Sequence, residues 1–455
     1  MVSSKDYTVR ICRKETISAA LPLQEHWLSL SNLDLLLPPL DVGVFFIYAK
    51  PPLESSASTF ASLVNVLKAS LAKSLVTYYP FAGEVVSNSM GEPELLCNNR
   101  GVEFIEAFAD VEIAELDFHN ADRSFEGKLV PRKKGGVLTV QATEMKCGGM
   151  VLGCTFDHRI SDAYSFNMFL VSWSEISSGK QISTIPSFRR SLLSPRRPGH
   201  FDASFNRFYI PSSQLPPLTK SSESINRIYY ITAANIDRIQ EMVTDGGPRR
   251  TKLEAFTAYL WKLAGRQAGK HVSHMGLVVD GRKRLGLAMD AYFGNVLSIP
   301  YASMEVGEME VKEIGEVVHG VVEAAAREEH FRGLVDWVEV RRPEAAVARV
   351  YVEEGMSVVV SSGRGFPVGE LEFGWGKALF GSYHFPWKGN AGYVMPMMSG
   401  RGDGDWVVYA HLCREIVEII EDNSDGFFEP LTVDYLGIKG NVNRLGEKII
   451  GFMLN

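Results

Sequence analysis

The segment T-F-D-H-R-I-S-D-A, residues 155–163, contains the side chains best suited to chemistry. His158 stands where an apolar, strand-like run ends, and Asp162 follows four residues later. An imidazole is suited to proton abstraction near neutral pH because its ordinary pKa is about 6.5. The pattern indicates a general base at the edge of a domain. On this segment alone, a structural histidine beside a helix N-terminus is the simpler interpretation.

Other chemistries are not indicated by the sequence. No serine or cysteine lies in a G-x-S-x-G elbow, so a covalent nucleophile is not expected. The odd number of cysteines and the absence of C-x-x-C pairs argue against a disulfide framework and against a zinc site. We therefore expect neither a metal nor a permanently bound cofactor. The cysteines are Cys12, Cys97, Cys147, Cys154 and Cys413.

Two apolar runs, residues 136–145 and 149–158, predict the strands that lead to the histidine, with a turn at Gly148 and Gly149. After His158 the apolar residues recur at i, i+3, i+4 and i+7, which predicts an amphipathic helix. Ser161 is a good N-cap type, so we expect the helix to begin there. His158 then lies at a strand-to-helix junction. The apolar residues are Phe166, Phe169, Leu170 and Trp173.

The rest of the chain alternates strand-like and helix-like segments, which predicts an α/β protein. Thr251 and Glu254 form a T-x-x-E capping box ahead of an apolar-periodic run in the second half. The other segments are strands at 8–12, 43–49 and 356–362 and helices at 60–77 and 311–329.

Residues 187–224 differ from their surroundings. They are rich in Pro, Ser and Arg and show little periodicity, which predicts a long crossover between two domains. We expect an N-terminal domain at residues 1–190, a linker at 191–224 and a C-terminal domain at 225–455.

The composition favours a soluble globular protein. The chain has 455 residues, of which 45% are hydrophobic and 22% charged, with a formal net charge of −7. A nucleic-acid binder usually shows a basic surplus, which is missing here. The N-terminus lacks the apolar region of a secretory signal, and no run of about 18 apolar residues predicts a membrane span. We expect a cytoplasmic location.

Several further motifs, in this order and together with H-x-x-x-D, resemble those of the BAHD family of plant acyl-CoA-dependent acyltransferases. The resemblance covers nearly the whole chain, and the joint match is specific although each motif alone is not. The motifs are L-S-N-L-D-L from Leu30, Y-P-F-A-G from Tyr79, V-V-D-G-R-K-R-L with Asp280 and Arg282, Y-F-G-N from Tyr292 to Asn295, and E-F-G-W-G from Glu372 to Gly376.

The resemblance implies two domains of mixed sheet and helices, each similar to chloramphenicol acetyltransferase. A solvent channel would run between them, with acyl-CoA entering from one face and the acceptor from the other. His158 would take the proton from an alcohol or amine, which attacks the thioester directly in a ternary complex. Family precedent also implies a monomer.

The resemblance assigns roles to further residues. Asp162 either orients the imidazole or, as the family favours, faces away from it and pairs with Arg282. The Trp375 N–H is implied as an oxyanion donor. Thr251 and Lys252 either contact a CoA phosphate or are only an N-cap and a surface lysine.

The glycine motif is expected to be a structural turn, formed by Glu372, Gly374 and Gly376. Glu372 stands where the family usually has aspartate, which leaves its pairing partner open.

The acceptor side departs from relatives that act on shikimate. There a threonine, a serine and a tyrosine meet the polar acceptor, and an arginine meets its carboxylate. The arginine position matches Gly365, and Arg364 beside it would point elsewhere in an extended segment. The other matching positions are Val42, Val44 and Phe46.

These departures predict an apolar, aromatic acceptor. The chain is most similar to coniferyl alcohol acyltransferases, and an amide-forming, piperine synthase-like enzyme with an amine acceptor such as piperidine is the alternative. A relative that binds CoA without catalysis is a third interpretation.

Overall fold

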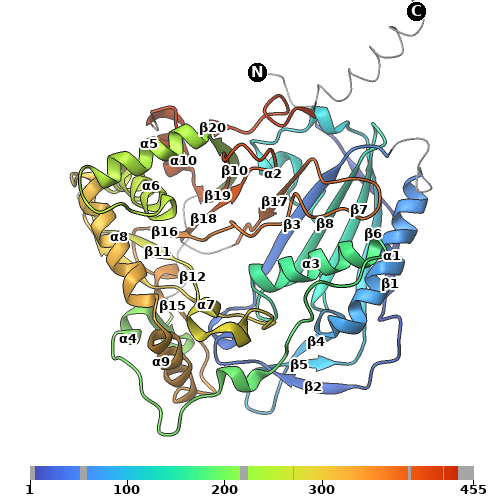
Figure 1. The fold of residues 1–455 in the computed structure, drawn as a ribbon, viewed down its shortest axis with the longest axis horizontal. Coiled ribbons are helices and arrows are strands. Elements are labelled where there is room, and N and C mark those ends of the chain that lie inside the picture. The colour runs from blue at the N-terminus through green and yellow to red at the C-terminus, as the bar shows by residue number, and fades with distance from the viewer. Residues whose placement is uncertain are drawn as a thin grey trace, which may run out of the picture.

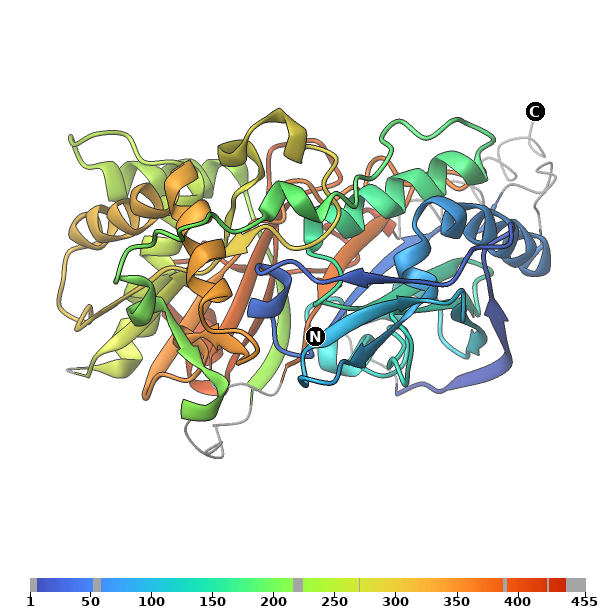
Figure 2. The same ribbon diagram turned by 90° about the horizontal axis from the view of Figure 1, so that it is seen from below.

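Two large β-sheets, each covered by helices, form the centre of this computed structural model, and three smaller sheets of two or three strands accompany them (Figures 1 and 2). The structure describes residues 6–51, 59–215, 224–269, 271–387, 391–423 and 425–438. The mixed architecture confirms the predicted α/β class.

The N-terminal sheet has six strands in the order β1-β6-β7-β8-β3-β17. Its last strand comes from the C-terminal half and pairs antiparallel with β3. Gly381 in β17 allows this approach, because a Cβ there would lie 2.5 Å from the ring of Phe46. The predicted domain at 225–455 therefore contributes a strand to the other sheet. The strands are β1 (Val9–Ile17), β3 (Asp41–Tyr48), β6 (Val102–Ala109), β7 (Leu138–Met145), β8 (Met150–Asp157) and β17 (Phe380–His384).

Helix α1 (Phe60–Thr77) packs against α3 (Ala163–Ser177) over the N-terminal sheet (Figure 1). Thr59 and Ser62 form a capping box, and the helix stops before Pro80, which cannot continue it. By length and apolar composition alone, α1 is the one described helix that could cross a membrane. Its apolar stripe lies in the protein core instead, through Leu63, Leu67, Leu71 and Leu75.

The C-terminal sheet has seven strands in the order β14-β11-β16-β18-β19-β10-β20. The helices that pack on it surround α6, whose side chains form a second core. The strands are β10 (Ser224–Ile231), β11 (Ser273–Leu277), β14 (Tyr301–Met304), β16 (Met356–Val360), β18 (Gly392–Met398), β19 (Trp406–Cys413) and β20 (Glu429–Pro430). The helices are α5 (Ala233–Thr244), α6 (Lys252–Ala268), α8 (Val311–Ala325) and α10 (Arg414–Asn423).

The remaining helices and strands lie outside the two large sheets. The helical run predicted at 311–329 is in fact two helices, because α8 ends at Ala325 and α9 begins at Glu328. The predicted crossover contains the short elements α4 and β9 and two 3-10 turns, at Arg190–Leu193 and Ser212–Gln214, while its residues 216–223 lie outside the described part. The remaining elements are β2 (His26–Ser29), β4 (Glu84–Ser87), β5 (Pro93–Cys97), β9 (Tyr209–Pro211), β12 (Val279–Asp280), β13 (Leu297–Ser298), β15 (Ala346–Ala348), α2 (Ala121–Ser124), α4 (Phe205–Phe208), α7 (Arg282–Leu285) and α9 (Glu328–Glu339).

Candidate active site

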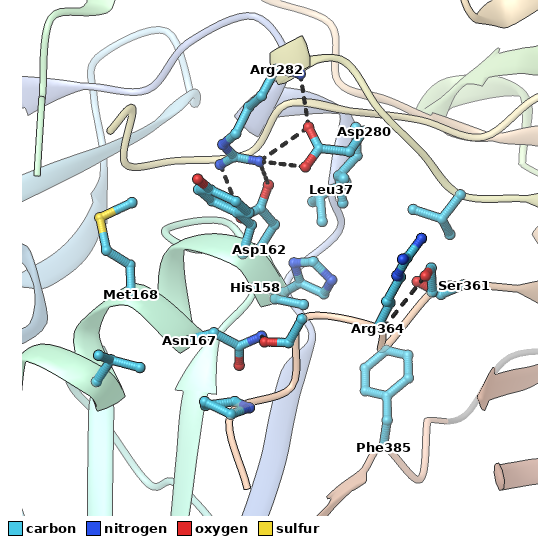
Figure 3. A pocket seen from close by; sticks show the side chains of 18 of the residues that line it. Leu37, His158, Asp162, Asn167, Met168, Asp280, Arg282, Ser361, Arg364 and Phe385 are labelled. Carbon is cyan, nitrogen blue, oxygen red and sulfur yellow. Dashed lines mark hydrogen bonds and ion pairs between the residues drawn. The ribbon is translucent and has the colours of Figure 1, made fainter. Parts of the chain in front are cut away.

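His158 follows the last residue of β8, at the predicted strand-to-helix junction (Figure 3). Its backbone N–H donates to the carbonyl oxygen of Leu40 at 2.9 Å. Its own carbonyl oxygen accepts from Nδ2 of Asn295, also at 2.9 Å. The histidine backbone is therefore fixed from both halves of the chain.

The imidazole of His158 lies near two aromatic rings. Ring centroids of Phe156 and Phe385 are 6.5 Å and 6.3 Å away. Burial in this setting lowers the pKa of His158 below its ordinary value of 6.5. Nδ1 is buried and has no hydrogen-bond partner among the described residues. The ring is therefore neutral near pH 7 and can accept a proton.

A cavity of about 690 Å³ leads to this imidazole. A second space of about 20 Å³ adjoins it, and both are lined by His158, Ala163, Phe385 and Tyr393. The volume of the large cavity is typical of a site for a small organic molecule. Polar groups at its wall come from Asn167, Ser361, Ser362, Arg364 and Lys283, and apolar groups from Leu37, Leu40, Met168, Val171 and Ile299.

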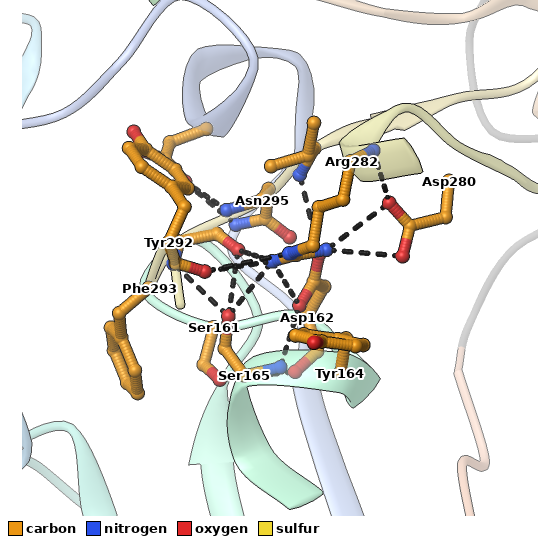
Figure 4. A network of polar contacts seen from close by, with 12 residues as sticks. Ser161, Asp162, Tyr164, Ser165, Asp280, Arg282, Tyr292, Phe293 and Asn295 are labelled. Atoms are coloured by element: carbon orange, nitrogen blue, oxygen red, sulfur yellow. Dashed lines mark hydrogen bonds and ion pairs between the residues drawn. The ribbon is translucent and has the colours of Figure 1, made fainter. Parts of the chain in front are cut away.

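Asp162 pairs with Arg282 and not with the histidine (Figure 4). The guanidinium donates to the two carboxylate oxygens at 2.8 Å and 3.1 Å. Asp162 also accepts from the backbone N–H groups of Ser165 and Val296, at 2.9 Å and 3.2 Å. Both oxygens are thus engaged, and the carboxylate holds the helix start and the ion pair.

The N-cap of α3 is Asp162 and not the predicted Ser161. The Asp162 carboxylate accepts the Ser165 N–H, whereas the Ser161 hydroxyl donates to the Asp162 carbonyl oxygen at 3.0 Å. A carboxylate is the better partner for the positive end of the helix dipole. Placing the cap one residue earlier was therefore wrong.

Arg282 is 2% exposed and extends the network into the C-terminal half. It donates to the carbonyl oxygen of Gly294 at 2.8 Å and to Oγ of Ser165 at 3.0 Å. Burial alone would lower its pKa, but the carboxylates of Asp162 and Asp280 reverse this and raise the pKa of Arg282. The cation is therefore permanently charged and joins α3 to the segment after α7.

Two residues of the site carried no predicted role. Asn295 donates from its backbone N–H and from Nδ2 to Oδ1 of Asp34, at 2.7 Å and 2.9 Å. Asp34 is fully buried and also accepts from Ser31. Asp34 lies in the L-S-N-L-D-L motif and Asn295 in the Y-F-G-N motif. The sequence therefore pointed to both residues, but it did not show that they bond to each other. Together they hold the carbonyl of His158.

Trp375 does not reach the site, so the implied oxyanion role is wrong for this structure. Its ring contacts Phe373 and Tyr48, with centroids 5.7 Å and 5.9 Å away. Tyr48 ends β3, and the strand begins at Asp41, opposite Asp157. At about 3.3 Å per residue, about 23 Å separate the two ends of the strand. Trp375 therefore lies at the end remote from His158.

The glycine motif forms a turn, as expected. Gly374 and Gly376 have φ of +102° and +120°, which a side chain would strain. The Glu372 side chain is exposed and makes no ion pair in the part of the chain that the structure describes. Instead its backbone N–H donates to Oγ of Ser174, in α3, at 2.8 Å.

Thr251 caps α6 in the predicted capping box with Glu254. The ammonium of Lys252 pairs with Asp237 at 2.6 Å. Neither residue is among those that line the cavity. Their predicted contact with a CoA phosphate stays a prediction.

The residues expected on the acceptor side divide between cavity and core. Val42 lines the small space beside His158. Val44 and Phe46 are fully buried and line neither space. The ring of Phe366 stacks on Phe46, and Val44 pairs with Tyr383 of the neighbouring strand β17. The structure thus brings one of the three predicted side chains to the site.

Arg364 lines the large cavity, contrary to the prediction that it points elsewhere (Figure 3). The prediction assumed an extended segment, but Arg364 and Gly365 form a turn, where alternation of faces does not apply. Gly365 lines the cavity as well. The Arg364 guanidinium makes no ion pair within the described residues.

A half-buried histidine with an unpaired Nδ1, at the meeting point of two cavities, is the arrangement of an enzyme that uses a general base. The chain matches the model of the Transferase family over residues 7–426. It belongs to this family, the BAHD acyl-CoA-dependent acyltransferases, whose co-substrate is acyl-CoA.

Among curated proteins, the chain is 28% identical to a hydroxycinnamoyltransferase of Narcissus pseudonarcissus, covering 88% of this chain and 94% of the relative. It is 29% identical to rosmarinate synthase of Plectranthus scutellarioides, covering 89% and 96%. It is 25% identical to benzyl alcohol O-benzoyltransferase of Petunia hybrida, covering 88% and 90%.

Solved structures show the same fold. Vinorine synthase superposes with a TM-score of 0.71 at 19% identity, covering 93% of this chain and 99% of that one. TRI101 of F. graminearum, complexed with coenzyme A and T-2 mycotoxin, gives a TM-score of 0.74 at 14% identity, covering 89% and 99%. The expected chloramphenicol acetyltransferase-like pair of domains is therefore confirmed.

Proposed function

We propose that this protein transfers an acyl group from acyl-CoA to the hydroxyl of an apolar, aromatic alcohol of the coniferyl alcohol type. The observation that carries the proposal is the imidazole of His158 at the junction of the two cavities, with Nδ1 unpaired and a pKa that burial lowers. Val42, Phe385 and Tyr393 support an apolar acceptor beside it. The Petunia relative, named for benzyl alcohol, is consistent with this class.

In the proposed reaction, His158 takes the proton of the acceptor hydroxyl as its oxygen attacks the thioester carbonyl carbon. The tetrahedral oxyanion then collapses and the carbon–sulfur bond breaks. The imidazolium returns its proton to the CoA thiolate, so that free CoA leaves and neutral His158 is restored. Ser361 and Ser362, which line the large cavity, carry hydroxyl groups that can donate to the oxyanion. No covalent acyl-enzyme is required.

An amine acceptor is the alternative, with an amide as product. A relative from Oryza sativa is named putrescine hydroxycinnamoyltransferase, at 27% identity over 87% of this chain. The same base serves either acceptor, since both lose one proton on attack. The product of a paired assay distinguishes ester from amide.

Arg364 favours a second kind of acceptor, one that carries a carboxylate. A guanidinium in a cavity without an ion pair is a ready partner for an acidic group. Transfer to shikimate that falls in Arg364→Gln, while transfer to coniferyl alcohol is unchanged, would establish this acceptor. Transfer to coniferyl alcohol alone would support the apolar one.

The test is release of free thiol from acetyl-, benzoyl- and 4-coumaroyl-CoA with coniferyl alcohol, shikimate or piperidine. Wild type is compared with His158→Ala and with His26→Ala, a control at an exposed histidine outside the cavity. We expect acceptor-dependent release that His158→Ala removes and His26→Ala keeps. Release that survives in His158→Ala would refute the general-base role.

A further inference from the structure

The small space beside His158 ends at an aromatic stack. Tyr383, on β17, forms part of its wall. The ring of Phe366 packs on Tyr383 with centroids 4.8 Å apart and stacks on Phe46 at 5.2 Å and 21°. Phe366 is 8% exposed and lines neither cavity. Its ring therefore packs against a residue of the wall of the small space without reaching that space itself.

The backbone around Phe366 faces the opposite way. Its neighbours Gly365 and Pro367 both line the large cavity. The Phe366 backbone N–H donates to the carbonyl oxygen of Gly363 at 2.9 Å, within a turn. One side of this segment therefore borders the substrate cavity, while its side chain closes the space over β3.

We propose that Phe366 is a plug that sets how deep an acceptor can enter beside His158. With the ring in place, about 20 Å³ is available there, roughly the space of one water molecule. Without the ring, the small space extends over Phe46 and Val44 and holds an aromatic group. This inference rests on the proposed function and concerns the length of its acceptor.

A substitution at Phe366 separates this role from general packing. Phe366→Ala opens the space, and Phe366→Leu opens it in part with less disturbance. Phe125→Leu is the matched control, because Phe125 stacks on Phe45 at 4.1 Å and 19°. Phe45 and Phe46 are neighbours on β3, so the control removes a similar stack from the opposite face of the strand.

The assay compares kcat/KM for benzyl alcohol and for the longer cinnamyl alcohol, with whichever of acetyl-, benzoyl- and 4-coumaroyl-CoA the wild type uses best. A hydrophobic pocket discriminates by about 10–200-fold per methylene. We therefore expect the ratio of cinnamyl to benzyl alcohol to rise at least about tenfold in Phe366→Ala, less in Phe366→Leu, and not in Phe125→Leu.

A binding measurement avoids dependence on turnover. An apolar void of the size left by an aromatic ring binds benzene-like molecules. Indole should raise the thermal midpoint of Phe366→Ala more than that of wild type or Phe125→Leu, because only Phe366→Ala gains a new apolar space. An unchanged ratio in a folded, active Phe366→Ala, together with a response to indole no larger than that of wild type, would overturn the inference while leaving His158-dependent transfer intact.

Discussion

Asp162→Asn should weaken the fold and spare the chemistry. Asparagine remains a good N-cap, so the bond from the Ser165 N–H is kept. The substitution removes the negative charge that faces Arg282. Both side chains are buried, with Asp162 1% and Arg282 2% exposed, so water cannot replace the lost partner. Leaving a buried charge without its partner costs about 3–5 kcal/mol. Asp280, 3.3 Å from the guanidinium, still compensates in part, so we expect about 3 kcal/mol.

The assay is urea unfolding followed by tryptophan fluorescence, with kcat and its pH profile measured on the same variant. A carboxylate that oriented the imidazole would change kcat by about 10⁴-fold when replaced by the amide. The contacts of Asp162 predict a kcat within a few fold of wild type and an unchanged pH profile.

Arg282→Met and the double variant complete the cycle. Each single change leaves one buried charge unpaired, while the double change places a neutral amide beside an apolar side chain. The double variant should therefore lose less stability than the two single losses added together. A stable Asp162→Asn enzyme with kcat reduced about 10³-fold or more, or with a shifted pH profile, would refute the structural assignment.

Three further outcomes follow from the site. His158→Ala should lower kcat by about 10²–10⁴-fold at unchanged urea midpoint, and a loss below tenfold would contradict its role as base. Because burial lowers the pKa of His158, kcat/KM should fall only below pH 6.5 as the imidazole becomes protonated, and a midpoint above 6.5 would contradict the desolvated setting. The His384 hydrogen bond lowers the pKa of Glu126, so this contact stabilises the fold above about pH 4.5 and is lost as the pH falls below it. Glu126→Gln should thus reduce the free energy of unfolding at pH 7, and this reduction should shrink as the pH falls below 4.5, as measured by urea titration across this range.

The local pattern of the sequence predicted the surroundings of His158 well. Strands β7 and β8, the turn at Gly148 and the helix after the histidine all lie where periodicity put them. The helix at 60–77 was predicted with its observed bounds. Each of these depends on spacing within one segment, which side-chain burial on a single face dictates.

The errors come from contacts between distant segments. Pairing of β17 with β3 joins residues more than 300 positions apart, and no local period encodes it. The prediction that the Arg364 side chain points away from the acceptor assumed that side chains alternate along an extended segment. Residues 364–365 form a turn instead, and the side chain lines the cavity. Trp375 lies in the expected motif, yet its distance from His158 depends on how the C-terminal segment crosses the sheet.

The same long-range contacts explain why the site depends on both halves of the chain. Asn295, from the C-terminal half, bonds both Asp34 and the carbonyl of His158. Arg282 secures the start of the helix that follows the histidine. Phe385, directly after β17, supplies one of the two rings that desolvate the imidazole. Since the lowered pKa and the fixed backbone both come from these contacts, separating the halves would leave His158 as an ordinary solvated histidine on the edge of a sheet.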